Sequence, residues 1–271
     1  MSDLLVPFDF SKNAIKALDQ AILISSVNHK KIEVLHITNE SVSRQYPKNW
    51  KYNGDIKILK EKLEAVVEER KELLGASAKT GLLVKEAATI SGGIISRMLQ
   101  GKLKLLVMGT HGSSGVYDKV FGTNTAVMVN HSIFPILVIP HNWKPVVIDH
   151  CVTVIKLNKL SSVSKRLKAW GKFFSSSVEA VQFTILKEAE GTYAKKEQID
   201  GIPCRIILNP IETPLAQDVL NFTRKLRSSL VILFTKEKTF LEKLFLNNLT
   251  YKLSGSITIP LLAIPYEETG S

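Results

Sequence analysis

The sequence is poor in cysteine and has no long apolar run. Its two cysteines, Cys151 and Cys204, are too few and too far apart for a disulfide framework or a cysteine zinc site. The longest apolar run is Leu230 to Phe234, five residues, whereas a membrane-spanning helix needs about 18. Because the first residues include Asp3 and Asp9 and carry no basic segment, we expect no secretory signal and a cytoplasmic location.

The sequence also lacks a concentration of charge in either half. Its net charge is +11, with 19 Lys and Arg against 13 Asp and Glu up to Lys144, and 17 against 12 after it. This even spread is not typical of a nucleic-acid footprint, and we expect neither nucleic acid nor a membrane as a partner. Local groups such as Lys165, Arg166, Lys168 and Lys172 have the spacing of a solvated helix face, and a surface for an anionic partner is the alternative.

Strands and helices alternate in the first half. Short apolar segments predict strands, and apolar residues three and four apart predict helices between them. The predicted strands are 4–7, 32–37, 82–84, 103–108 and 136–139; the predicted helices begin after Ser11, span 55–74 and 94–99, and begin after Gly122. Such alternation indicates an α/β fold with an open, mostly parallel five-stranded sheet and helices on both faces.

The second half repeats the first. The segment 135–140 (PILVIP) reappears as 260–265 (PLLAIP), an offset of 125 residues, and the same offset pairs strand 105–108 with 230–233. Near the start of the halves, segment 152–157 matches the first strand at an offset of 149, so the second half lacks a stretch about as long as the 55–74 helix. We predict tandem domains at 1–143 and 144–271, the second shortened, joined at a polar connection over 141–146.

One segment passes from a strand to a helix through several glycines. It runs from Met108-Gly109-Thr110-His111-Gly112 to Gly122-Thr123-Asn124. Glycines let backbone N–H groups approach a phosphate, and a helix start offers unpaired donors. The spacing fits neither a Walker A loop nor a dinucleotide loop. On these residues alone, anion binding and a tight structural turn both stay open.

With this spacing, Gly109-x2-Gly112-x9-Gly122-Thr123, the chain resembles the universal stress proteins. The likeness extends to Leu5-Val-Pro-Phe-Asp-Phe-Ser11, to Val34-Leu-His-Ile37 and to Pro135-Ile-Leu-Val-Ile-Pro140. It is strong over the first half and rests on the strand pattern in the second, so the whole resembles a tandem universal stress protein. The resemblance implies a Rossmann-like fold of the adenine nucleotide alpha hydrolase-like type in both domains.

The resemblance also implies a site for ATP, with Mg²⁺ or Mn²⁺ on the phosphates, in the first domain. In the family, the aspartate after the first strand contacts the nucleoside, and the residue after the second-strand histidine meets the adenine edge through its backbone. The glycine signature and the hydroxyl after it hold ribose and phosphates. Carried onto this sequence, the implied site residues are Pro7, Phe8, Asp9, Ile37, Met108, Gly109, Gly112, Gly122, Thr123 and Asn124, with no metal ligand assigned.

Physical chemistry agrees with a ligand role for Asp9. A carboxylate at the carboxyl end of a central strand points into the crevice where open α/β sheets bind ligands. Capping the next helix is the alternative, although Ser11 is available as the cap. Phe8 stands where the family commonly has a small hydroxylated residue, and we expect it to narrow the adenine pocket or stack there.

Nothing in the sequence predicts an efficient ATPase. No Ser-His-Asp arrangement or carboxylate pair is visible, and no lysine follows the glycine segment to stabilise phosphoryl transfer. His111 is interpreted as a solvent-facing loop histidine or a phosphate contact, and His36 as a satisfied structural histidine. We expect a stress-response regulator that binds an adenine nucleotide. A slow ATPase assisted by Thr123 or His111 and a nucleotide-free scaffold are the alternatives.

The glycine signature is absent from the second half. At the same offset, Gly109, Gly112, Gly122 and Thr123 become Phe234, Glu237, Asn247 and Asn248, and Asp9 becomes Asn158. We expect no nucleotide there, which leaves the second domain for a protein partner or another ligand. The closing strands 136–139 and 261–264 are apolar on both faces, and family members pair such strands, so we expect an internal pseudo-dimer. Trp170, Phe173 and Phe174 are core residues or, alternatively, part of a homodimer surface.

Overall fold

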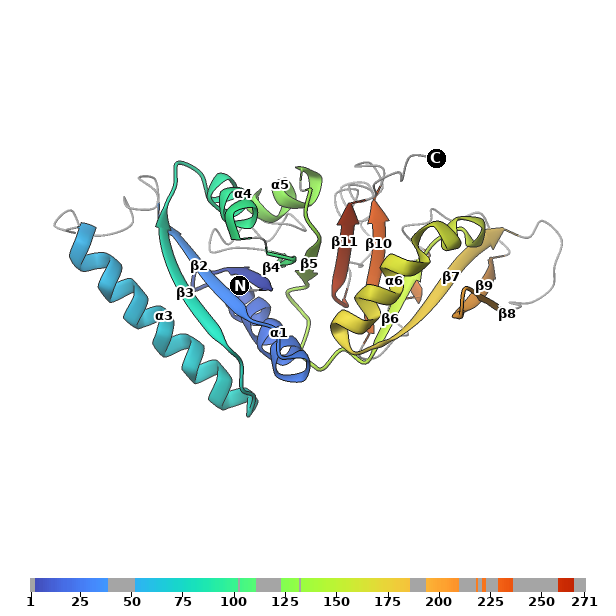
Figure 1. Cartoon of the computed structure of the whole chain (residues 1–271), viewed down its shortest axis with the longest axis horizontal. Coiled ribbons are helices and arrows are strands. Elements are labelled where there is room, and N and C mark those ends of the chain that lie inside the picture. The colour runs from blue at the N-terminus through green and yellow to red at the C-terminus, as the bar shows by residue number, and fades with distance from the viewer. Residues whose placement is uncertain are drawn as a thin grey trace. The chain divides into compact units, whose positions relative to one another are not determined.

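The structure, a computed structural model, divides into two compact units, Met1–Val146 and Val147–Ser271 (Figure 1). It describes residues 3–38, 52–101, 103–110, 123–131, 133–185, 194–209, 218, 221–222, 229–235 and 258–265. Among these residues, no helix is both long and apolar enough to cross a membrane.

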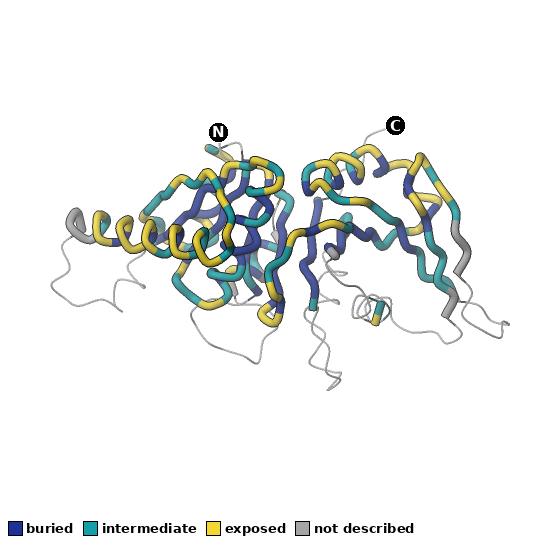
Figure 2. Tube along the Cα trace, turned by 90° about the horizontal axis from the view of Figure 1, so that it is seen from below, coloured by how far each residue is buried: buried dark blue, intermediate teal, exposed yellow. Residues whose placement is uncertain are grey.

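The first unit contains a five-stranded parallel sheet in the order β3-β2-β1-β4-β5. Its strands are β1 (Leu4–Pro7), β2 (Ile32–Thr38), β3 (Thr80–Glu86), β4 (Leu105–Gly109) and β5 (Ile136–Ile139). Nearly every residue of β1, β2, β4 and β5 is buried, as expected for strands covered on both faces (Figure 2). The predicted parallel sheet is confirmed.

Among the described residues of this unit, four helices cover the sheet: α1 (Lys12–Asn28), α3 (Tyr52–Leu74), α4 (Ile90–Gly101) and α5 (Thr123–His131). The Ser11 hydroxyl accepts a hydrogen bond from Ala14 N at 3.1 Å, which confirms Ser11 as the cap of α1. The long helix α3 is tied to α1 by the Asp19–Arg70 pair, in which two guanidinium nitrogens donate to the two carboxylate oxygens at 2.7 Å each.

The connection that leaves the first unit is packed on α1. Gln20, which is fully buried, accepts a hydrogen bond from Trp143 Nε1 at 2.8 Å and donates to Val146 O at 2.9 Å. One turn earlier, Lys16 donates to His141 O. These contacts hold the polar connection predicted at 141–146 against the helix.

In its described residues, the second unit has six strands in the order β11-β10-β6-β7-β9-β8. They are β6 (His150–Val154), β7 (Ser177–Ile185), β8 (Ala194–Ile199), β9 (Ile202–Asn209), β10 (Ser229–Thr235) and β11 (Leu261–Pro265), and β8 is antiparallel to β9. A 3-10 turn (Leu157–Lys159) and α6 (Leu160–Phe174) follow β6. The prediction of five strands is therefore wrong for this unit. The strand predicted at 152–157 is observed at 150–154, so it begins and ends earlier.

A hairpin accounts for the extra strand. Asp200 and Gly201 have φ angles of 50° and 70° and join β8 to β9 as a two-residue turn, the geometry that Asp-Gly favours. In the first unit, α3 stands between the second and third strands of the chain. In the described part of the second unit, strand β8 occupies that position, in line with the missing helix that the two offsets predict.

Candidate functional site

The sheet order of the first unit creates a switch point between β1 and β4. From β1 the chain goes to β2 and β3 on one side, and later to β4 and β5 on the other. Ligands of open α/β sheets bind beyond the carboxyl ends of strands at such a point. Pro7 and Gly109 end these two strands, so the structure brings together the predicted residues 7–9 and 108–109.

Asp9 lies at the rim of this edge. Its side chain is exposed, and its Oδ1 accepts a hydrogen bond from Ser11 N at 3.0 Å. Since Ser11 caps α1 with its own hydroxyl, the alternative role of Asp9 as the cap of that helix is not the one observed.

The backbone of Ile37 faces the side of β2 on which β1 has ended. Phe8 N donates to Leu35 O at 2.8 Å, and the last register pair is Pro7 with Leu35. Backbone groups two residues apart along a strand point the same way, so the N–H and C=O of Ile37 also point toward β1. No described group of β1 lies opposite them. A polar ligand at this edge can therefore meet one donor and one acceptor of the same residue.

His36 contacts the backbone where the ladder stops. Continued parallel pairing would join Ile37 N–H to Phe8 O, but that oxygen is 2.7 Å from His36 Nδ1. His36 Nδ1 therefore carries the proton and donates it, because a carbonyl only accepts. The Nε2 atom of this 4% exposed residue has no hydrogen-bond partner among the described residues, so the expectation of a fully satisfied histidine is wrong at that atom.

Phe8 packs beneath the rim. It is 3% exposed, and its ring meets the Phe10 ring edge-on with centroids 5.2 Å apart. Phe10 in turn lies 5.2 Å from the His36 ring and has a φ of 62°, which is rare for a bulky residue. The three rings form a cluster that fixes the turn carrying Asp9.

Gly109 has a packing role. A Cβ there would lie 2.6 Å from Asn13 O and 2.8 Å from Asn13 Cβ, so only glycine lets the first turn of α1 approach the end of β4. Thr125, which sequence reasoning missed, donates from its Oγ1 to Gly109 O at 2.8 Å and joins α5 to the same strand end. Met108 is 7% exposed within the sheet.

The other predicted residues are only partly described. Thr123 begins α5, and Asn124 is exposed in its first turn, where helix N–H groups lack intrahelical partners. Gly112, Gly122 and the alternative contact His111 lie outside the described residues. Among the described residues, no cluster of His, Cys, Asp and Glu could hold a metal ion.

In the second unit, β10 corresponds to β4, and side chains of the same unit lie at the end of this strand. Gly109 pairs with Ile139, and Phe234 pairs with Ile264 in the same register, 125 residues later at both positions. The Arg166 guanidinium lies 5.4 Å from the centroid of the Phe234 ring and donates to Pro265 O at 2.7 Å. This edge therefore carries an aromatic ring and a cation where the first unit has glycine.

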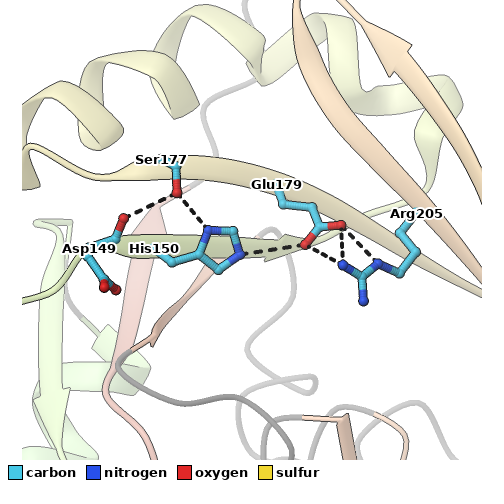
Figure 3. Close-up of polar contacts among 5 residues, drawn as sticks. All are labelled: Asp149, His150, Ser177, Glu179 and Arg205. Atoms are coloured by element: carbon cyan, nitrogen blue, oxygen red, sulfur yellow. Dashed lines mark hydrogen bonds and ion pairs between the residues drawn. The ribbon is translucent and has the colours of Figure 1, made fainter.

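A second polar group joins three strands of the second unit (Figure 3). His150 Nδ1 lies 2.8 Å from Ser177 Oγ, which donates to Asp149 O, and His150 Nε2 lies 3.5 Å from Glu179. Arg205 donates to both Glu179 oxygens at 2.9 and 3.1 Å. Since Ser177 Oγ lies between His150 and a backbone carbonyl and Arg205 holds Glu179, the group ties β6, β7 and β9 together. Sequence reasoning missed it because its members are distant along the chain.

Residues 1–140 match the model of the Universal stress protein family. The chain belongs to the universal stress protein family. A comparison with curated proteins gives no match.

Two solved structures resemble this chain over nearly its whole length. A universal stress protein from Archaeoglobus fulgidus DSM 4304 is 13% identical over 99% of this chain and 97% of its own, with a TM-score of 0.64. A functionally unknown protein from Pseudomonas aeruginosa PAO1 is 10% identical over 98% and 92%, with a TM-score of 0.58. These likenesses show the fold, which is that of tandem universal stress proteins. A universal stress protein solved in complex with cAMP is 16% identical over 52% of this chain and 97% of its own, with a TM-score of 0.39.

Proposed function

We propose that the first unit binds ATP, with Mg²⁺ or Mn²⁺ on its phosphates, and that the protein acts as a stress-response regulator. The observation that carries the proposal is the Ile37 backbone, whose N–H and C=O point past the end of β1 at the switch point of the sheet. An adenine edge offers one acceptor and one donor side by side, which matches this pair.

The neighbouring groups suit the rest of a nucleotide. The exposed Asp9 carboxylate can accept hydrogen bonds from ribose hydroxyls. The first turn of α5, with Thr123 and Asn124, offers N–H donors and the positive end of a helix dipole to phosphates. The divalent ion takes the phosphate oxygens as its main ligands, in keeping with the few carboxylates at this edge.

A regulatory role needs a path from the ligand to the rest of the chain. Helix α1 begins at the candidate site, where Asn13 packs on Gly109, and the same helix holds the 141–146 connection through Gln20. A nucleotide that favours one position of α1 would also favour one position of this connection.

Thermal unfolding with and without ATP and Mg²⁺ tests the binding. We expect ATP with Mg²⁺ to raise the melting temperature of the intact chain, and Gly112→Glu to abolish that rise by placing a carboxylate among the phosphates. The matched control is Gly75→Glu on the exposed turn after α3, which leaves the rise intact. No rise at millimolar ATP contradicts the proposal.

Hydrolysis is tested separately by phosphate release over many turnovers. The proposal expects none above the background rate, because the sequence carries no Ser-His-Asp arrangement, no carboxylate pair and no lysine after the glycine segment. Sustained release that disappears in Thr123→Ala would instead make the protein a slow ATPase.

A further inference from the structure

Helix α6 carries the most one-sided charge in the described chain. Between Lys156 and Val178 the sequence has six basic residues and no acidic residue. By contrast, the long exposed helix α3 has six acidic and five basic residues and two ion pairs of its own, Lys57–Glu61 and Lys71–Glu68. The balance of α3 is typical of a helix that only faces water, and the imbalance of α6 is not.

The cations of this segment are of two kinds. Arg166 is turned inward and bonded to Pro265 O. The others are lysines with exposed side chains and no carboxylate partner among the described residues: Lys156, Lys159, Lys165, Lys168 and Lys172. Spacings of three and four residues put Lys165, Lys168 and Lys172 on one side of the helix, and all three are exposed. We call these three residues the lysine ridge.

Two half-buried aromatic side chains lie near the end of the same helix. Phe174 is 2% exposed and belongs to the core, as sequence reasoning expected, but Trp170 and Phe173 keep part of their surface in solvent. Their ring centroids are 5.1 Å apart, and Trp170 lies 5.9 Å from Phe174. The ridge is therefore bordered by the small exposed Ala169 and, four residues on, by the half-buried Phe173, whereas Trp170 lies further around the helix.

We propose that this face of α6 binds the surface of an anionic lipid bilayer. Lysine clusters on an exposed helix face attract acidic headgroups, and an aromatic ring at the border of the cluster, here Phe173, can reach the boundary between headgroups and acyl chains. Lysine is depleted from protein interfaces, which disfavours a protein partner. Arginine, which reads nucleobases and pairs with phosphate in a bidentate manner, is here turned into the unit, which disfavours nucleic acid.

The proposal departs from the expectation drawn from the charge of the halves. Summed over each half, the excess of cations is almost equal, which hides a segment of 23 residues without a carboxylate. Binding to a bilayer surface requires no membrane-spanning helix, so it is compatible with the helices observed.

Sedimentation of the full-length protein with lipid vesicles tests the proposal. We expect binding to vesicles of phosphatidylcholine mixed with phosphatidylserine, none to pure phosphatidylcholine, and release in high salt as the Debye length falls to about 3 Å at 1 M. Replacing the ridge with Lys165→Gln, Lys168→Gln and Lys172→Gln should weaken binding roughly a hundredfold, at about fivefold per lysine. Lys57→Gln, Lys60→Gln and Lys62→Gln on α3 change the net charge equally and should leave binding intact.

Two further measurements keep the test decisive. Because Lys168 approaches the β8–β9 turn near Gly201, the double variant Lys165→Gln and Lys172→Gln should weaken binding without altering the melting temperature. In addition, Phe173→Ala should weaken binding to anionic vesicles, because its ring borders the ridge. The proposal is overturned by absent vesicle binding, by an equal loss in the α3 control, or by tighter binding of the ridge to single-stranded RNA than to vesicles.

Discussion

His36 makes a hydrogen bond to the backbone just beyond the end of β1. Its Nδ1 occupies Phe8 O, the atom to which Ile37 N–H would otherwise donate. The sequence places a histidine on this strand and, through the family resemblance, a ligand contact at Ile37. The link between the two requires coordinates, because it depends on where β1 ends relative to β2.

Replacing His36 with phenylalanine should weaken ATP binding and leave the fold intact. Without the Nδ1 donor, Phe8 O becomes available to Ile37 N–H, and adenine loses one hydrogen bond, about a tenfold loss of affinity. A titration of nucleotide into the variant measures it. His29→Asn, at the exposed end of α1, serves as the control. Unchanged affinity in a His36→Phe protein of normal melting temperature would show that the ladder end has no part in binding.

Cys151 should be unreactive in the folded protein. Burial raises the pKa of its thiol to about 12, and burial also raises the pKa of Cys204. The folded state thus keeps protons that the unfolded state loses above its ordinary thiol pKa of about 9, so this contribution to the free energy of unfolding declines as pH rises from there toward 12. A thiol-reactive dye at pH 8 should label neither cysteine until denaturant is added, and native labelling would contradict the burial described.

Helices of the first unit depend on one another through the Asp19–Arg70 pair. The Asp19 side chain is 6% exposed and that of Arg70 is 23% exposed. Arg70→Met should leave a nearly buried carboxylate without its partner and lower the free energy of unfolding by about 2 kcal/mol, less than for a fully buried pair because Arg70 is partly solvated. Denaturant unfolding measures the change, and Asp19→Asn with Arg70→Met should recover part of it. A loss no smaller in the double variant would mean that the methionine disrupts packing instead.

Elements with strong local signals were predictable from the sequence. Strands β1 and β5 were predicted at their observed bounds, and Ser11 was predicted as the cap of α1. The hairpin of β8 and β9 was not, because Ala194–Ile199 is polar and takes its strand form from pairing with β9. The Asp200-Gly201 pair is the one local sequence signal of this hairpin, and the prediction of five strands does not take it into account.

The candidate site was predictable only in part. Sequence spacing and the resemblance name residues 7–9, 37 and 108–109, and the sheet order brings them to one edge. The reason for glycine at 109 differs from the expected one, since Asn13 of α1 requires it. The roles of Thr125 and His36 arise from contacts between distant elements, which no local pattern carries.

The whole molecule repeats one fold with different strand ends. Glycine ends β4 in the first unit, whereas Phe234 beneath Arg166 occupies the equivalent place in the second. We propose that a single adenine nucleotide binds per chain, in the first unit, and that the second unit binds none.

Isothermal titration calorimetry of ATP with Mg²⁺ into the full-length protein tests this claim most directly. We expect one ATP to bind per chain. Gly112→Glu should abolish this binding, and Phe234→Leu in the second unit should leave it unchanged. Two nucleotides per chain, or one that persists in Gly112→Glu, would contradict it.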